Sequence, residues 1–159
     1  MENLYAISFL RLFLYEDGGD YPDFLLVQTL RAFRKKFGNA RFDMLAYVPP
    51  TKSGTLVRNF AVKISNILKI PVSHKLIKTR ETKEQKVFEN TCLKQDNVRD
   101  AFVYKDPHEI FGKNILLIDD VFDSGATIKE IGRYFTKLGA EKIAPLVIAK
   151  TVGGDIDDQ

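Results

Sequence analysis

Residues 115–127 carry the sequence feature that most constrains the fold. Four apolar residues, Ile115 to Ile118, are followed directly by two aspartates, Asp119 and Asp120. Such an apolar run is typical of a strand that is buried on both faces, and a buried strand does not accommodate unpaired carboxylates. We therefore expect the strand to end where the aspartates begin.

A small-residue loop and a helix follow the two aspartates. Residues 123–127 are Asp-Ser-Gly-Ala-Thr, and apolar residues then recur at helical spacing, at Ile128, Ile131, Phe135 and Leu138. The pattern predicts a strand, an acidic edge, a loop and a helix N-terminus. In an open α/β sheet a phosphorylated ligand binds at such a point, because backbone N–H groups and the helix dipole both favour an anion.

The residues from Ile115 to Thr127 resemble the phosphoribosyl-pyrophosphate (PRPP) signature of the class I phosphoribosyltransferases. The shared pattern is four apolar, two acidic and two apolar residues, then a small-residue loop that ends in Gly-x-Thr. The resemblance implies the type I phosphoribosyltransferase fold, an α/β fold with a mostly parallel sheet flanked by helices and a small N-terminal hood. It also implies an enzyme that transfers phosphoribosyl from Mg²⁺-bound PRPP to a nitrogenous base, or releases the base in the reverse direction.

The rest of the chain alternates between predicted strands and helices, which favours a mostly parallel sheet built from βαβ units. Helical spacing predicts helices at 22–37, closed by Gly38, and at 56–68, and short apolar runs predict strands at 42–48, 72–77, 101–104 and 142–149. We expect a single domain over 1–159, with a hood or other N-terminal elements at 1–38, a core at 42–150 and a frayed tail at 151–159.

Composition narrows the class of protein. The chain is 45% hydrophobic and 28% charged, which is typical of an ordinary globular domain. The single cysteine, Cys92, excludes an intramolecular disulfide framework, and two histidines give no cluster for zinc. No apolar run reaches the roughly 20 residues that span a bilayer, and Glu2 and Arg11 interrupt the apolar N-terminus. We expect a cytoplasmic protein with no membrane partner.

Asp119 and Asp120 are candidates for binding ribose. Ionised carboxylates accept hydrogen bonds from a vicinal diol such as the ribose 2′- and 3′-hydroxyls. Adjacent side chains alternate across a regular strand, so both can face one ligand only if the backbone turns there. The alternative is a charged strand end capped by lysines.

The loop after the aspartates is a candidate cradle for the 5′-phosphate, through its backbone N–H groups and two hydroxyls. The loop residues assigned to this role are Asp123, Ser124, Gly125, Ala126 and Thr127. Helix capping is a compatible alternative, because Thr127 and Glu130 have capping-box spacing. Since a phosphate repels a carboxylate, Asp123 should point toward the base. Resemblance to the 6-oxopurine enzymes implies that Asp123 handles a proton on the base, and a loop-stabilising role stays open.

A second loop resembles the pyrophosphate-binding loop of the same family. It follows a predicted strand and consists of Thr51, Lys52, Ser53 and Gly54. Backbone amides and a lysine aimed at the leaving pyrophosphate would stabilise the transition state more than the ground state. A solvated lysine is the alternative, and Arg58, one helical turn on, is a further candidate.

A narrower resemblance covers roughly residues 42–150 and points to the ComF-like branch of the family, especially the phosphoribosyltransferase domain of RecQ-like helicases. It rests on residues 78–86, Asn90, Asn97, Ala101 and Phe102. In phosphoribosyltransferases a basic flexible loop closes over the pyrophosphate. Arg80, Lys83 and Lys86 are the candidates for this role, with a solvated charged face as the alternative.

Taken together, the catalytic candidates are Asp123, Lys52 and Arg80. The expected cofactor is Mg²⁺, carried on the oxygens of PRPP, with Asp119 and Asp120 as possible ligands. Expected partners are PRPP or a nucleoside 5′-monophosphate, a second copy of the chain in a homodimer, and a helicase or DNA-uptake machinery. The sequence does not specify the acceptor base.

Two other functions remain open. One is a PRPP- or nucleotide-sensing module without turnover, because a fold does not fix a function. The other is a nucleic-acid-binding accessory domain, which a basic run beside Phe33 and Phe37 would serve. That run consists of Arg31, Arg34, Lys35, Lys36 and Arg41. The net charge of +3 is too small to require a nucleic-acid partner.

Overall fold

A computed structural model of the chain describes residues 20–50, 55–81, 98–122 and 125–150. Its main sheet has three parallel strands in the order β1, β4, β5, with bounds β1 (Met44–Tyr47), β4 (Asn114–Phe122) and β5 (Lys142–Lys150). Val72 adds an isolated parallel bridge to Leu45 on the other side of β1. The predicted α/β fold with a mostly parallel sheet is confirmed.

Two further strands form a separate antiparallel pair. They are β2 (Leu76–Lys78) and β3 (Phe102–Tyr104), and Lys78 pairs with Phe102 in their register. The strand predicted at 72–77 is therefore split between the bridge at Val72 and the first two residues of β2. A short 3₁₀ helix, η2 (Pro107–Ile110), precedes β4.

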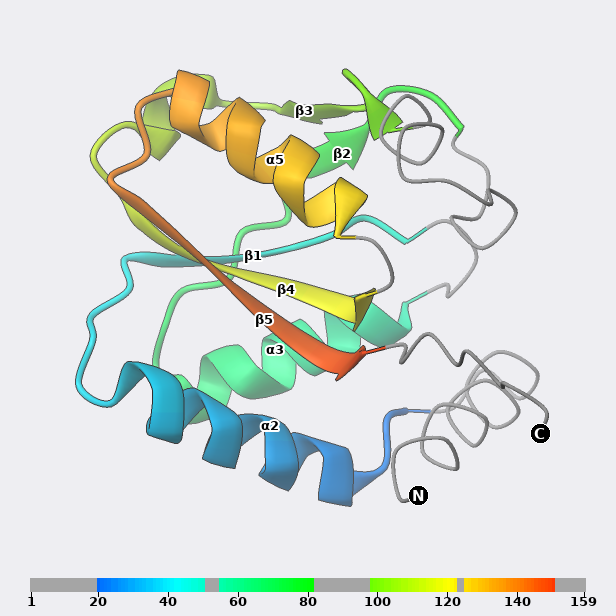
Figure 1. The fold of residues 1–159 in the computed structure, drawn as a ribbon, viewed down its shortest axis with the longest axis vertical. Helices are drawn as coiled ribbons and strands as arrows, with labels where there is room; N and C mark the ends of the chain where they lie inside the picture. Colours follow the sequence, from blue (N-terminus) through cyan, green and yellow to red (C-terminus); the bar gives the residue numbers. More distant parts are fainter. Residues whose placement is uncertain (1–19, 51–54, 82–97, 123–124, 151–159) are drawn as a thin grey trace, which may run out of the picture.

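Helices cover both faces of the parallel sheet (Figure 1). On one face lie α2 (Asp23–Phe37) and α3 (Leu56–Leu68), and on the other lie α5 (Ala126–Lys137) and the β2–β3 pair. Side chains of β4 alternate between the two cores: Leu116 and Ile118 belong to the first, and Ile115 and Leu117 to the second. All four are fully buried, as predicted for a strand covered on both faces.

The prediction that this strand ends at the aspartates is wrong. β4 continues to Phe122 and stays paired with β5, where Asp119 lies opposite Val147. By alternation Asp119 faces the same side as Leu117, toward α5 and the β2–β3 pair. The Asp119 Oδ1 accepts the backbone N–H of Asp120 at 2.9 Å, so the buried carboxyl has a hydrogen bond and the strand does not need to end.

The predicted first helix is confirmed as α2, which is preceded by Pro22 and ends before Gly38, at φ 53°. Its buried residues include Leu25 and Phe33, and the helix packs against α3 and β5. Residues 1–38 are assigned to a hood or other N-terminal elements. Within them, α2 belongs to the helical layer that covers one face of the sheet. Residues 1–19 and the expected tail lie outside the described residues. No helix in the described part of the chain is long and apolar enough to cross a membrane.

Candidate functional site

The parallel strands β1, β4 and β5 end at one edge of the sheet, here called the carboxyl edge. In Figure 1 the arrowheads of β4 and β5 point to the same side, where α5 begins. In an open α/β sheet, ligands bind outside the carboxyl ends of the strands. The residues at this edge are therefore the candidate site.

Asp119 and Asp120 lie near the end of β4, at the carboxyl edge. Asp119 is only 7% exposed, and Asp120 is half-buried. Burial, followed by the negative charge of Asp120, raises the pKa of Asp119 well above its usual value. The ionised form of Asp119 is therefore disfavoured in the free protein. A ligand that brings hydrogen-bond donors or a cation would stabilise this ionised form.

Lys78, the last residue of β2, is close enough to this carboxylate pair for its charge to interact with both aspartates. Burial lowers the pKa of Lys78, and the charges of Asp119 and Asp120 act in the opposite direction without cancelling that effect. Lys78 in turn lowers the pKa of Asp119, although burial prevails there too. An amine and two carboxylates thus share a partly dehydrated corner of the carboxyl edge.

Sequence reasoning gave Lys78 no role. The sequence feature that could have identified Lys78 is its position directly after the predicted strand 72–77. Side chains that follow the ends of strands often lie together at the edge of a sheet. Nothing in the sequence placed β2 on the same side of β4 as Asp119.

The start of α5 lies at the carboxyl edge, next to the predicted phosphate loop. Gly125 precedes the helix with φ 71°, a left-handed conformation that suits a residue without Cβ. Ala126 is buried and Thr127 half-buried in the first turn of this helix. The suggested capping box does not form: Thr127 lies inside the first turn of α5, and Glu130 accepts hydrogen bonds from Asp100 and Arg133 instead.

Arg80 is exposed, and its Nη2 donates to the backbone oxygen of Arg99 at 2.9 Å. The remaining predicted site residues lie outside the described residues: Thr51, Lys52, Ser53, Gly54, Lys83, Lys86, Asp123 and Ser124. Their assigned roles, like that of Arg80, stay predictions.

A second polar pair at the carboxyl edge was not predicted. Tyr47, the last residue of β1, has its hydroxyl 2.9 Å from Nδ1 of His74. Burial raises the pKa of Tyr47, and the charge of Arg58 on α3 opposes this. Tyr47, His74 and Arg58 come from three different segments of the chain, so no local sequence motif predicts that they lie together.

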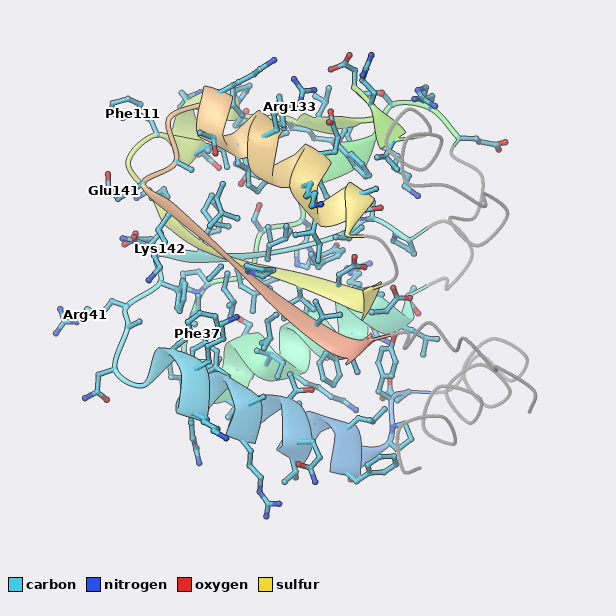
Figure 2. All side chains as sticks on the ribbon, viewed as in Figure 1. Phe37, Arg41, Phe111, Arg133, Glu141 and Lys142 are labelled. Atoms are coloured by element: carbon cyan, nitrogen blue, oxygen red, sulfur yellow. The ribbon has the colours of Figure 1, made fainter. Side chains whose placement is uncertain are left out.

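The basic run of α2 and the segment after it lies apart from this site. Arg31, Arg34, Lys35, Lys36 and Arg41 are all exposed. Phe33 is buried, and the rings of Phe33, Phe37 and Phe42 pack against one another. Figure 2 shows Phe37 and Arg41 at the end of the molecule opposite the carboxyl edge. The two predicted aromatic neighbours therefore serve the core and do not offer faces for stacking bases.

Within the described ranges, no group of three or more His, Cys, Asp or Glu residues could hold a metal ion. The carboxylate oxygens of Asp119 and Asp120 nevertheless fit Mg²⁺, which proteins commonly bind through one or two carboxylates together with substrate phosphates.

Comparison with known proteins gives one family match. A family model described as a phosphoribosyl transferase domain matches residues 31–156. No curated protein has a matching sequence.

Solved structures share the fold at low sequence identity. A glutamine PRPP amidotransferase from B. subtilis, complexed with ADP and GMP, has a TM-score of 0.52 and 18% identity, over 78% of this chain and 26% of that one. A structure described as the allosteric regulatory enzyme of purine biosynthesis gives 0.52 and 18%, over 78% and 25%. A purine phosphoribosyltransferase from Pyrococcus horikoshii gives 0.50 and 23%, over 86% and 83%. This chain spans about a quarter of the length of the first two.

Proposed function

This chain belongs to the phosphoribosyl transferase domain family, and we propose that it binds Mg²⁺–PRPP at the carboxyl edge and transfers the phosphoribosyl group to a nitrogenous base. The observation that carries the proposal is the buried carboxyl of Asp119 beside Asp120 and Lys78. Two ribose hydroxyls can donate to these carboxylates, which stabilises the ionised form that burial disfavours.

The 5′-phosphate and the pyrophosphate of PRPP are assigned to two other segments of the chain. The 5′-phosphate is assigned to residues 123–127, where α5 begins, because N–H groups and the helix dipole attract an anion there. The pyrophosphate is assigned to residues 51–54, between the end of β1 and the start of α3. Lys78, whose charge interacts with both aspartates, would offset phosphate charge beside the carboxylates.

In the proposed reaction the bond from C1 of the ribose to pyrophosphate breaks, and a bond from C1 to a nitrogen of the base forms. Pyrophosphate leaves with the electron pair, and the base loses a proton. Orientation alone can contribute roughly 7–11 kcal/mol in well-arranged cases. Mg²⁺, held by Asp119 and Asp120, would neutralise charge on the phosphate oxygens when bound.

Several finer assignments belong to the same proposal. Asp123 would handle the proton on the base, and Lys52 and Arg80 would act on the pyrophosphate. The resemblance of residues 78–102 supports the ComF-like branch, with a helicase or DNA-uptake machinery as partner and a homodimer as the assembly. A cytoplasmic location is part of the same proposal.

The test is a pyrophosphate-release assay with Mg²⁺–PRPP and a panel of purine and pyrimidine bases. We expect release with at least one base, and at least a hundredfold slower release by Asp120→Asn. The matched control is Arg41→Gln, an exposed change at the opposite end of the sheet that should leave the rate unchanged. Release that does not depend on Asp120 would contradict the proposal, and PRPP binding without release for any base would replace it with a sensing function.

A further inference from the structure

Three charged residues tie α5 to the turn that leads into β3. Nη2 of Arg133 donates to Asp100 at 3.0 Å and to Oε1 of Glu130 at 2.6 Å, and its Nε donates to Oε2 of Glu130 at 3.1 Å. The backbone N–H of Asp100 donates to the same Oε1 at 2.9 Å. Arg133 projects from α5 in Figure 2. We call Asp100, Glu130 and Arg133 the α5 clamp.

The clamp holds a backbone conformation that Asp100 does not favour by itself. Asp100 has φ 51°, and a residue with a Cβ is strained in this region, although Asp tolerates it better than most. Both its N–H and its carboxylate are bound by side chains of α5. The conformation of the turn is therefore set by the helix.

The same turn is bonded to the strand that carries Lys78. Thr79, the next residue, donates its N–H to the oxygen of Ala101 at 2.9 Å and its hydroxyl to the oxygen of Asp100 at 3.3 Å. Lys78 itself pairs with Phe102. A continuous path of hydrogen bonds thus runs from α5 through Asp100 and Thr79 to the backbone of Lys78.

We propose that the α5 clamp fixes the backbone of Lys78 at the end of β2, so that its amine is held near the carboxylate pair when PRPP binds. Asp100, Glu130 and Arg133 are then positioning residues, which act through Lys78 and do not touch the ligand. One helix would carry both the phosphate-binding start at Gly125 and the clamp that fixes the amine. The inference rests on the proposed function of the carboxyl edge.

A double-mutant cycle separates positioning from plain stabilisation. Calorimetry gives the Kd of Mg²⁺–PRPP for the wild type, Arg133→Met, Lys78→Met and the double variant. We expect Arg133→Met to weaken binding about fivefold to tenfold, but to have no further effect once Lys78 is replaced, because coupled residues are non-additive. The matched control is Lys137→Met, which removes an exposed cation one turn further along α5 and should leave the Kd unchanged.

Two results would overturn the proposal: an unchanged Kd in Arg133→Met, or equal Arg133→Met effects with and without Lys78. Amide hydrogen exchange gives a second readout that needs no ligand. In Arg133→Met the amides of Thr79 and Asp100 should exchange faster, while Arg133→Lys restores part of the protection. Unchanged exchange would also overturn the clamp. If the wild type fails to bind Mg²⁺–PRPP, the proposed function fails, whereas faster exchange would still support the clamp's hold on β2.

Discussion

Asp119 on β4 and Glu130 on α5 are two largely buried carboxylates whose pKa values are shifted in opposite directions. Burial and the neighbouring carboxylate of Asp120 raise the pKa of Asp119, and the charge of Lys78 opposes this without cancelling it. Glu130 accepts three hydrogen bonds, two from Arg133 and one from the Asp100 N–H, and its pKa is lowered.

This difference in pKa indicates that Asp119 is suited to binding a ligand, whereas Glu130 has a structural role. The charge of Glu130 is already compensated, so a ligand has little to add there. The charge of Asp119 is under-compensated, which costs stability in the free protein and favours a ligand that supplies donors or a cation. Glu130 is nevertheless connected to the site. As part of the α5 clamp, it is linked by hydrogen bonds to the backbone of Lys78, whose charge interacts with Asp119.

Among the substitutions that test this comparison of Asp119 with Glu130, the largest expected effect concerns the amine of Lys78. Lys78→Met should weaken Mg²⁺–PRPP binding about 10- to 100-fold, because a charge-assisted hydrogen bond to phosphate contributes roughly 1.5–3 kcal/mol. Calorimetry measures the change. Lys142→Met, an exposed lysine at the start of β5, is the control. Equal Kd values for the wild type and Lys78→Met would show that Lys78 belongs to the fold and not to the site.

A smaller effect is expected at Glu130. Glu130→Gln should lower the free energy of unfolding by about 1–2 kcal/mol at pH 7, because charged hydrogen bonds to Arg133 and Asp100 are lost or weakened. The folded pKa of Glu130 is depressed, so its contribution exists above the unfolded pKa and is lost as the pH falls through the folded one. Denaturant unfolding at pH 7 and pH 3 checks this, with the exposed Glu141→Gln as control. A loss of the same size at both values would contradict the assignment.

The smallest effect has the opposite sign. Asp119→Asn should raise the free energy of unfolding by about 1 kcal/mol at pH 7, because it removes a carboxylate that burial penalises. The folded pKa of Asp119 lies above the unfolded one, so the folded state holds the proton more tightly and stability falls as the pH rises between them. The gain should therefore vanish below the unfolded pKa, near pH 3. A destabilised variant at neutral pH would mean that Asp119 is satisfied in the free protein.

Much of the fold could be predicted from local patterns. The spacing of apolar residues and the Pro22 and Gly38 boundaries gave α2 almost to the residue, and the run from Ile115 to Ile118 gave a strand buried on both faces. Both are properties of neighbouring residues, so no distant contact was needed.

What was missed depends on contacts between distant segments. β4 runs past Asp119 because its pairing with β5 continues to Phe122, and Glu130 accepts a hydrogen bond from the backbone N–H of Asp100 on a distant turn. Lys78 reaches the site only through the pairing of β2 with β3. Local desolvation and capping rules could not weigh these partners.

The most direct test of the account is calorimetric titration of the free protein with Mg²⁺–PRPP, for the wild type and for the Asp119→Asn/Asp120→Asn variant. We predict a micromolar Kd for the wild type and at least a hundredfold weaker binding for the variant, which should unfold no more readily than the wild type. No binding by the wild type, or the same Kd for both proteins, would contradict it.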